Sequence, residues 1–442
     1  MPTRLTPRHK LPYFLLCVDK SGEEGREEDG TLLSERIVGA VRGSDPKVTD
    51  IFVMSHGWKG DVPGAIEQYD QWIDAMADCT EDRARAREVR PGFTPLIVGF
   101  HWPSLPFGDE GTGGNAFDTT SGAGEDAFVE LWAERIADTP AARTALHTLF
   151  AAALDDLEPD RLSSAVIGAY QTLDREAGLG AGGPCAAPEA DRAGFDPQQL
   201  YLDGADAEAS FGGGFLGGLL SPLRQLSFWT MKKRARTCGE TGGHRLVSAI
   251  REAGSNDVRI HLMGHSFGCI VVSSILRGTE VAHPLHVSSV LLVQGALSLW
   301  SFATELPGDA GTSGWFRPVL DRNRISGPMV VTTSRFDRAV GSLYPLAAGA
   351  AGQVAYKIPP SAELPTYGAL GAFGAQGAGV NAQARVLTLG DVTSNYGLAP
   401  AQVYNVNGDA VIRAGGGLSG AHSDISHPEV GHLFWNVVLA AR

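Results

Sequence analysis

Val258–Arg277 reads VRIHLMGHSFGCIVVSSILR, in which the pentapeptide GHSFG at 264–268 separates two apolar runs. The pattern predicts a strand, a tight turn that carries Ser266, and a helix. Such a turn holds serine in a strained backbone conformation that exposes its hydroxyl, and the helix N-terminus offers N–H groups to developing negative charge. We interpret Ser266 as a nucleophile rather than an ordinary turn serine, because no other serine of the chain has this context.

Seven apolar runs of the chain, one of which overlaps the stretch quoted above, have the length and composition of strands that are covered on both faces. They are Tyr13–Val18, Asp50–Met54, Pro95–Phe100, Asp257–Met263, Val287–Val293, Pro328–Thr333 and Gln402–Val406. Residues 62–79 and 427–441 are expected to be helices, each with a proline in its first turn. Strands that alternate with helices in this way predict an α/β fold with a doubly wound, mostly parallel sheet.

One connection is far longer than a crossover helix requires, since roughly 120 residues at 105–226 interrupt the alternation. Glycine makes up 56 of the 442 residues, about twice its usual share. Within the insertion, glycine-rich tracts lie at 111–124 and 178–184, and helices are expected at 124–138 and 139–157. We predict a core of residues 1–104 and 227–442, with 105–226 forming a large helical, glycine-rich cap or lid over a site.

Net charge, hydropathy and cysteine content bear on the partners of the protein and on its cellular compartment. The formal net charge of −14 argues against a nucleic-acid partner, and no apolar run reaches the roughly 18 residues of an integral membrane helix. The apolar stretch 11–18 follows basic residues as in a signal peptide, but it is short and no cleavage site follows, so we interpret it as a strand. Five widely spaced cysteines without C-x-x-C favour a reducing compartment. We therefore expect a cytoplasmic protein and leave its oligomeric state open.

The pentapeptide and its flanks resemble the nucleophile elbow of the α/β-hydrolase fold, and other segments occur in that family's order. IFVMS at 51–55 leads into HGWK at 56–59, which is similar to the HG-containing loop after the third strand. LIVGFHWPS at 96–104 resembles the next strand and a branch of uncharacterised bacterial α/β-hydrolases. The resemblance covers about 50–120 and 245–442. It implies a serine hydrolase of the esterase or lipase kind and names no substrate.

The resemblance also implies an oxyanion hole, made of two backbone N–H groups that stabilise the charged intermediate of acyl transfer. One belongs to Phe267, directly after the nucleophile, and the other to Trp58, with Gly57 as the alternative donor. A plain tight turn after a strand is the other interpretation of the His-Gly pair. Residues beside these donors are expected to bind substrate: His56, Gly57, His265 and Trp102.

Chain order in this fold is serine, then acid, then histidine. Asp337 follows the predicted strand 328–333, where the family places its acid, and Asp409 after the last strand is the main rival. The family's histidine lies in the loop before the last helix. His422 falls in that loop after a glycine run, whereas His427 precedes a proline and fits a helix boundary. We expect Ser266, Asp337 and His422 to be catalytic, with His427 as the alternative base.

No metal and no cofactor are expected. The histidines and aspartate at 422–432 lack the H-E-x-x-H spacing of a zinc site, and no glycine-rich phosphate loop is present. A serine, histidine and acid suffice for acyl transfer through a covalent intermediate.

The substrate is expected to be a small or lipid-like carboxylic ester with an apolar acyl or alkyl group. An apolar glycine-rich tract at 211–220 and the basic residues Lys232, Lys233, Arg234 and Arg236 are compatible with transient membrane contact. We favour a packed helix whose cations stay in water, because the chain is acidic overall. The same triad serves amidases and peptidases, thioesterases and acyltransferases. A non-catalytic binding protein on the same fold is the alternative from another class.

Overall fold

The structure is a computed structural model that describes residues 3–58, 62–104, 123–203, 218–254, 257–279, 285–306, 309, 311–344, 364–382, 385–417 and 419–441. The chain divides into two compact units. The first consists of Met1–Ser104, Arg234–Gly341 and Gly368–Arg442, and the second of Leu105–Lys233 and Ser342–Tyr367. The second unit thus contains the expected insertion together with a segment that the sequence had grouped with the core.

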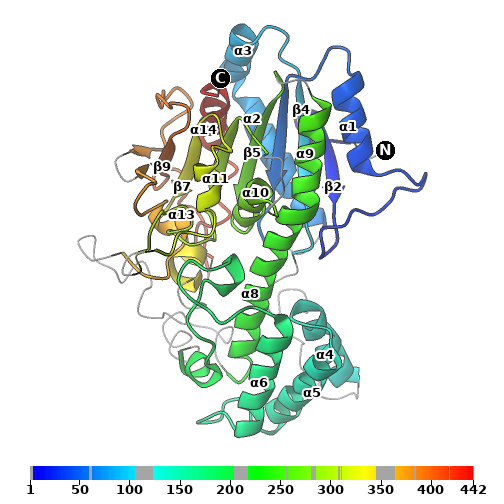
Figure 1. Cartoon of the computed structure of the whole chain (residues 1–442), viewed down its shortest axis with the longest axis vertical. Helices are drawn as coiled ribbons and strands as arrows, with labels where there is room; N and C mark the ends of the chain where they lie inside the picture. The colour runs from blue at the N-terminus through cyan, green and yellow to red at the C-terminus, as the bar shows by residue number, and fades with distance from the viewer. Residues whose placement is uncertain are drawn as a thin grey trace. The chain divides into compact units, whose positions relative to one another are not determined.

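The first unit is built on a nine-stranded sheet with the order β1-β2-β4-β3-β5-β6-β7-β9-β8 (Figure 1). Its strands are β1 Thr3–Leu5, β2 Pro12–Cys17, β3 Asp50–Ser55, β4 Pro95–His101, β5 Arg259–His265, β6 Ser289–Val293, β7 Met329–Thr333, β8 Val386–Thr388 and β9 Val403–Asn407. Only the β1–β2 pair of this sheet, as described, is antiparallel. The predicted α/β class with a mostly parallel sheet is confirmed.

All seven predicted strands are present, with ends that differ by one or two residues. The sequence missed β1 and β8, which have three residues each and are largely exposed. Such short, exposed strands at sheet edges contain no run of buried apolar residues. The apolar run that predicts the central strands is therefore missing from their sequence.

Helices cover both faces of the sheet. In the first unit they are α1 Leu33–Gly43, α2 Val62–Asp78, α3 Thr80–Val89, α9 His244–Ala253, α10 Gly268–Arg277, α11 Arg317–Asp321, α13 Leu370–Phe373 and α14 Pro428–Leu439. Phe52 and Met54 of β3 join a core cluster with Trp72 of α2 and Phe434 of α14. Val53 between them is equally buried and faces the other side, where α10 packs on β3 and β5.

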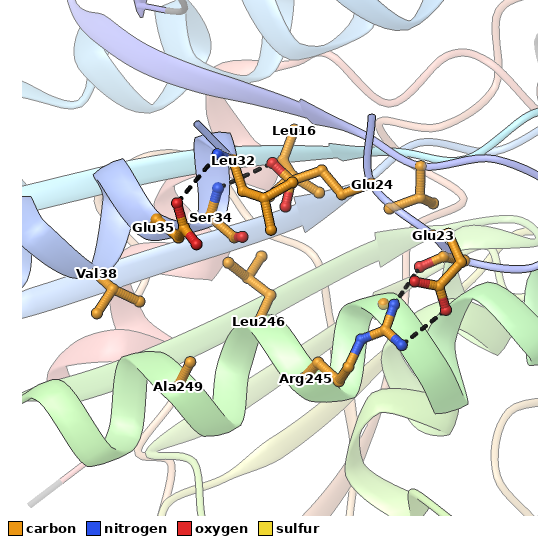
Figure 2. A pocket seen from close by; sticks show the side chains of 13 residues that line it. Leu16, Glu23, Glu24, Leu32, Ser34, Glu35, Val38, Arg245, Leu246 and Ala249 are labelled. Carbon is orange, nitrogen blue, oxygen red and sulfur yellow. Dashed lines mark hydrogen bonds and ion pairs between the residues drawn. The ribbon is translucent and has the colours of Figure 1, made fainter. Parts of the chain in front are cut away.

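A groove of about 350 Å³ opens between α1 and α9, with Leu16 of β2 at its floor (Figure 2). Its polar rim is bonded within the protein, because Arg245 pairs with Glu23 and the Ser34 N–H donates to Glu24. The groove residues are Leu16, Val18, Gly22, Glu23, Glu24, Leu32, Ser34, Glu35, Val38, Gly242, Arg245, Leu246 and Ala249. The side chains of the Ser266 region are not among them.

The second unit is mainly helical over its described residues. Its helices include α4 Ala123–Arg135, α5 Pro140–Asp155, α6 Ser164–Ala177, the 3₁₀ turn η2 Pro188–Ala190 and the first part of α8 Ser221–Cys238. Residues 197–203 are also helical. The two predicted helices of the insertion correspond to α4 and α5. Thr139 caps α5 by accepting the Ala142 N–H, and Pro140 occupies its first turn. Most of the glycine-rich tracts at 111–124 and 211–220 lies outside the described residues.

The cations of α8 bond to other protein groups. Lys233 Nζ donates to the last carbonyls of α6, at Ala177 and Gly178, and Arg236 pairs with Glu240. The side chains of Lys232 and Arg234 are buried, so the expectation that these cations stay in water is wrong for both. None of the helices in the described ranges is long and apolar enough to cross a membrane.

Lys232 lies at the centre of a buried polar cluster in the second unit. Its Nζ donates to the Tyr344 hydroxyl at 2.9 Å, and that hydroxyl donates to Asp191 Oδ2 at 2.5 Å. The ammonium also lies 4.3 Å from the ring centre of Trp229. Burial lowers the pKa of Lys232 to about 7, although the charge of Asp191 opposes this effect.

Replacing Lys232 with methionine is expected to remove a pH dependence of folding stability. The pKa of Lys232 falls from 10.5 to about 7 on burial, so between these values the unfolded chain binds more protons than the folded protein. The free energy of unfolding therefore rises with pH across that window, by up to about 1.4 kcal/mol per pH unit. Urea unfolding followed by circular dichroism from about pH 6 to about pH 10 should show a flatter slope for Lys232→Met.

Lys233→Met is the matched control, because Lys233 is the next residue of the same helix and is partly exposed. It removes an equal charge without emptying the buried cluster. A slope that persists in Lys232→Met, or that disappears equally in Lys233→Met, would contradict the assignment of this pH dependence to Lys232.

Candidate active site

Ser266 stands on a strained turn between β5 and α10. Its φ is 56°, in the left-handed region that a residue with a side chain rarely adopts. The Ser266 N–H donates to Val293 O at 3.1 Å, and the Ser266 carbonyl accepts from Cys269 N at 3.1 Å and Ala296 N at 3.2 Å. These bonds to the end of β6 and the start of α10 hold the turn in its strained form.

Two glycines make this turn sterically feasible. A Cβ at Gly264 would lie 2.5 Å from Gly268 O, and a Cβ at Gly268 would lie 2.2 Å from Ser55 O at the end of β3. Both distances are shorter than atoms tolerate, so the helix start can approach the two strands only without these side chains. The glycines of the pentapeptide therefore have the packing role that the sequence pattern predicts.

Ser266, His422 and Asp337 form a continuous chain of hydrogen bonds. His422 Nε2 lies 2.8 Å from Ser266 Oγ, and His422 Nδ1 lies 2.7 Å from Asp337 Oδ2. A carboxylate accepts, so the Nδ1–H donates to Asp337 and Nε2 is left to accept the serine proton. Ser266 is 4% exposed and Asp337 1%. The three side chains thus meet in a nearly dry environment in which such bonds are strong.

Asp337 is fixed by groups other than His422. Gln294 Nε2 donates to Asp337 Oδ2 at 2.9 Å, and the Val340 N–H donates to Oδ1 at 3.2 Å. The Gln294 amide is itself held, because Thr332 Oγ1 donates to its Oε1 at 3.1 Å. Gln294 also has a positive φ of 47°. Sequence reasoning missed this residue, although a polar residue directly after the buried strand β6 was a usable signal.

Asp409 and His427, the alternative acid and base, bond to residues outside the Ser266 chain of hydrogen bonds. Asp409 accepts from the Arg335 N–H at 2.9 Å and lies 3.5 Å from the Arg335 guanidinium. His427 Nε2 lies 2.7 Å from Asp424 Oδ1, and Asp424 in turn accepts the backbone N–H of Arg413. These pairs hold the loops that flank the Ser266 chain. The structure therefore brings Asp337 and His422 to Ser266 and engages Asp409 and His427 elsewhere.

The loop after β3 is anchored through His56. Its N–H donates to the Tyr69 hydroxyl at 3.0 Å, its Nδ1–H donates to Gly57 O at 2.6 Å, and its Nε2 accepts from His101 Nδ1 at 2.9 Å. The Trp102 ring stacks on the His56 ring at 5.7 Å with 9° between the planes. Every polar atom of the His56 ring is thereby committed to shaping this loop.

The anchored loop lies against the nucleophile. A Cβ at Gly57 would come within 2.9 Å of Ser266 Cβ, so glycine is needed for this approach. The Trp58 ring stacks on the Phe267 ring, with centres 5.4 Å apart and 15° between the planes. The backbones of residues 58 and 267, from which the two oxyanion donors are expected, are thus neighbours of Ser266.

The four residues expected to bind substrate are buried. They are His56, Gly57, His265 and Trp102. Their contact with a substrate stays a prediction. Among the described residues, no group of three or more His, Cys, Asp and Glu side chains could hold a metal ion. His432 is bonded to Asp82 and to Ser394 O.

No family model matches the chain, and no curated protein or solved structure shows significant similarity to it. A function therefore cannot be carried over from a relative. The evidence for function is the arrangement of side chains around Ser266.

Gly268→Ala is expected to destabilise the protein, whereas Gly39→Ala is expected to stabilise it. The new methyl group at 268 would overlap Ser55 O, which can be relieved only by moving β3 or the turn, at a cost of about 1–3 kcal/mol. Gly39 lies in α1 with no atom within 4 Å of a Cβ, so alanine there should add about 0.5–1 kcal/mol. Thermal and urea unfolding measure both changes.

Equal stability of the two alanine variants would show that the turn does not depend on the close approach of Gly268 to β3. The reactivity of Ser266 provides a second measurement, because a displaced turn should slow its modification in the Gly268 variant only.

Proposed function

We propose that this protein is a serine hydrolase of the α/β-hydrolase fold that cleaves a carboxylic ester through an acyl-enzyme intermediate. The observation that carries the proposal is the hydrogen-bonded chain from Ser266 Oγ through His422 to Asp337, at a serine with a left-handed backbone. The nucleophile, base and acid are 156 and 85 residues apart in the sequence. This geometry is what nucleophilic acyl transfer requires, and the order serine, acid, histidine along the chain is the one found in the α/β-hydrolase fold.

In the first half of the reaction, Ser266 Oγ bonds to the carbonyl carbon of the ester. Its proton passes to His422 Nε2, and the negatively charged Asp337 stabilises the imidazolium through the Nδ1–H bond. The backbone N–H groups of Trp58 and Phe267 are proposed to stabilise the oxyanion. The carbon–oxygen bond to the alcohol then breaks, and His422 Nε2–H protonates the departing oxygen.

In the second half, water replaces the alcohol. His422 removes a proton from water, whose oxygen bonds to the acyl carbon, and the bond to Ser266 Oγ breaks as His422 returns its proton to the serine. The products are one carboxylic acid and one alcohol, and the enzyme is regenerated. Gln294 contributes by keeping Asp337 Oδ2 aimed at His422, since both bond to the same oxygen.

An apolar substrate group is favoured by the aromatic pair beside the nucleophile. Trp58 is only partly buried and stacks on Phe267, so its ring offers apolar surface near Ser266. Amides, thioesters and acyl transfer to an alcohol use the same triad and remain alternatives. The role of residues 105–226 as a cap stays a prediction. All five cysteines are free, which supports the proposed cytoplasmic location.

A fluorophosphonate should label wild-type protein once, at Ser266. An activated serine displaces fluoride from this probe, so intact-mass spectrometry is expected to show a single adduct that Ser266→Ala lacks. Ser34→Ala, at the start of α1, is the matched control and should label like wild type. Once wild type is shown to label, untreated wild-type protein is tested on p-nitrophenyl esters of increasing acyl length. Absence of any adduct on folded wild type would overturn the hydrolase proposal in favour of a binding protein on the same fold.

Asp337→Asn should lower kcat for ester hydrolysis by about 10⁴-fold, because asparagine favours the wrong tautomer of the base. Asp409→Asn is the matched control, since Asp409 bonds to Arg335 rather than to His422, and should retain most activity. The pair His422→Asn and His427→Asn separates the two candidate bases in the same way. Greater loss at Asp409 or His427 than at Asp337 or His422 would reassign the triad.

A further inference from the structure

His265, directly before the nucleophile, uses both ring nitrogens within the protein. Its Nε2 lies 2.9 Å from the carbonyl oxygen of His422, and its Nδ1 lies 3.1 Å from Gln68 Nε2. A carbonyl only accepts, so Nε2 carries the hydrogen, and Nδ1 accepts from the Gln68 amide. The ring is 1% exposed and packs against the His422 ring with centres 4.8 Å apart.

Gln68 continues this chain of bonds to the loop after β3. It lies on α2, is 5% exposed, and its Oε1 accepts the Gly57 N–H at 3.3 Å. Only one orientation of the Gln68 amide lets its Oε1 accept from Gly57 while its Nε2 donates to His265. The Gly57 N–H donates to Gln68, Gln68 donates to His265, and His265 donates to the His422 carbonyl, with every donor facing an acceptor. We call Gln68 and His265 the buried bridge.

The bridge joins the three segments that the proposed reaction uses. At one end is the loop that carries the Trp58 N–H, in the middle is the residue next to Ser266, and at the other end is the backbone of His422. Gln68 and His265 are 197 residues apart, and His265 and His422 are 157 apart. Acyl transfer tolerates only displacements well below 1 Å between the catalytic groups. A hydrogen-bond network across these segments therefore fixes the distances on which the reaction depends.

We propose that Gln68 and His265 are positioning residues that fix the oxyanion loop and the His422 backbone relative to Ser266. This inference rests on the proposed hydrolase function. The sequence placed His265 in contact with substrate. In the structure, both ring nitrogens of His265 have protein partners. The bridge therefore acts through the His422 backbone and Gly57. We expect the bridge to contribute to kcat, because the polar groups of both side chains bond to protein groups.

Gln68→Met and Gln68→Glu test the bridge without changing the volume of the side chain much. Methionine breaks both bonds, whereas glutamate still accepts from Gly57 but cannot donate to His265 when ionised. With p-nitrophenyl butyrate, both should lower kcat by about 10- to 100-fold and leave KM within about twofold. The rate of fluorophosphonate labelling should fall in parallel.

Gln71→Met and Gln71→Glu are the matched controls. Gln71 lies on the same helix, is exposed, and donates to Glu67, so its replacement should leave kcat unchanged. His265→Gln places an amide near the position of Nε2 and should restore part of the rate that His265→Leu loses. Circular dichroism confirms that each variant is folded before its rate is compared.

The double variant Gln68→Met/His265→Leu separates a bridge from two independent contacts. Residues of one network are non-additive, so the double variant should lose no more kcat than the worse single variant. Full additivity, or Gln68 variants with the kcat of the Gln71 controls, would overturn the bridge while wild-type labelling keeps the hydrolase proposal standing. An unlabelled wild type would overturn both.

Discussion

The left-handed backbone of Ser266 is the constraint on which the rest of the site depends. With a φ of 56°, the turn reverses the chain so tightly that β5 ends one residue before the serine and α10 begins two residues after it. This geometry requires glycine at 264 and 268 and carbonyl and N–H partners at the end of β6. The turn thus presents a hydroxyl at the edge of the sheet, and the cost of its strain is offset by the packing around it.

The parallel sheet explains why residues so distant in sequence meet at this serine. Carboxyl ends of parallel strands share one edge, so each loop that leaves the sheet there can contribute a side chain. The loop after β3 supplies Gly57, the turn after β5 supplies Ser266, and Gln294 follows β6. Asp337 comes after β7, and His422 after β9. The central position of β5 places Ser266 between the loop after β3 and Asp337, which follows β7.

Polar groups at this edge form two layers. Ser266, His422 and Asp337 are the proposed reacting layer. A buried layer of amide and imidazole groups holds them, including Gln294 behind Asp337 and Gln68 beside the His-Gly loop. Neutral amides suit this role, because each offers a donor and an acceptor and brings no charge into a dry site. In the second unit, by contrast, the buried polar group is the cationic side chain of Lys232. It lies among aromatic rings, and its burial lowers its pKa.

The sequence by itself determined the features that are local: the central strands, the helices with their proline starts, and the turn at Ser266. Each depends on neighbours within a few residues, so periodicity and glycine spacing suffice to reveal it. Asp337 and His422 were proposed from chain order, but only the tertiary structure brings them to Ser266 in preference to Asp409 and His427. Gln68 left no mark in the sequence that sets it apart from other glutamines, and Gln294 is marked only by its position directly after the strand β6. Their partners are 197 and 43 residues away, and folding of the sheet alone decides such distances.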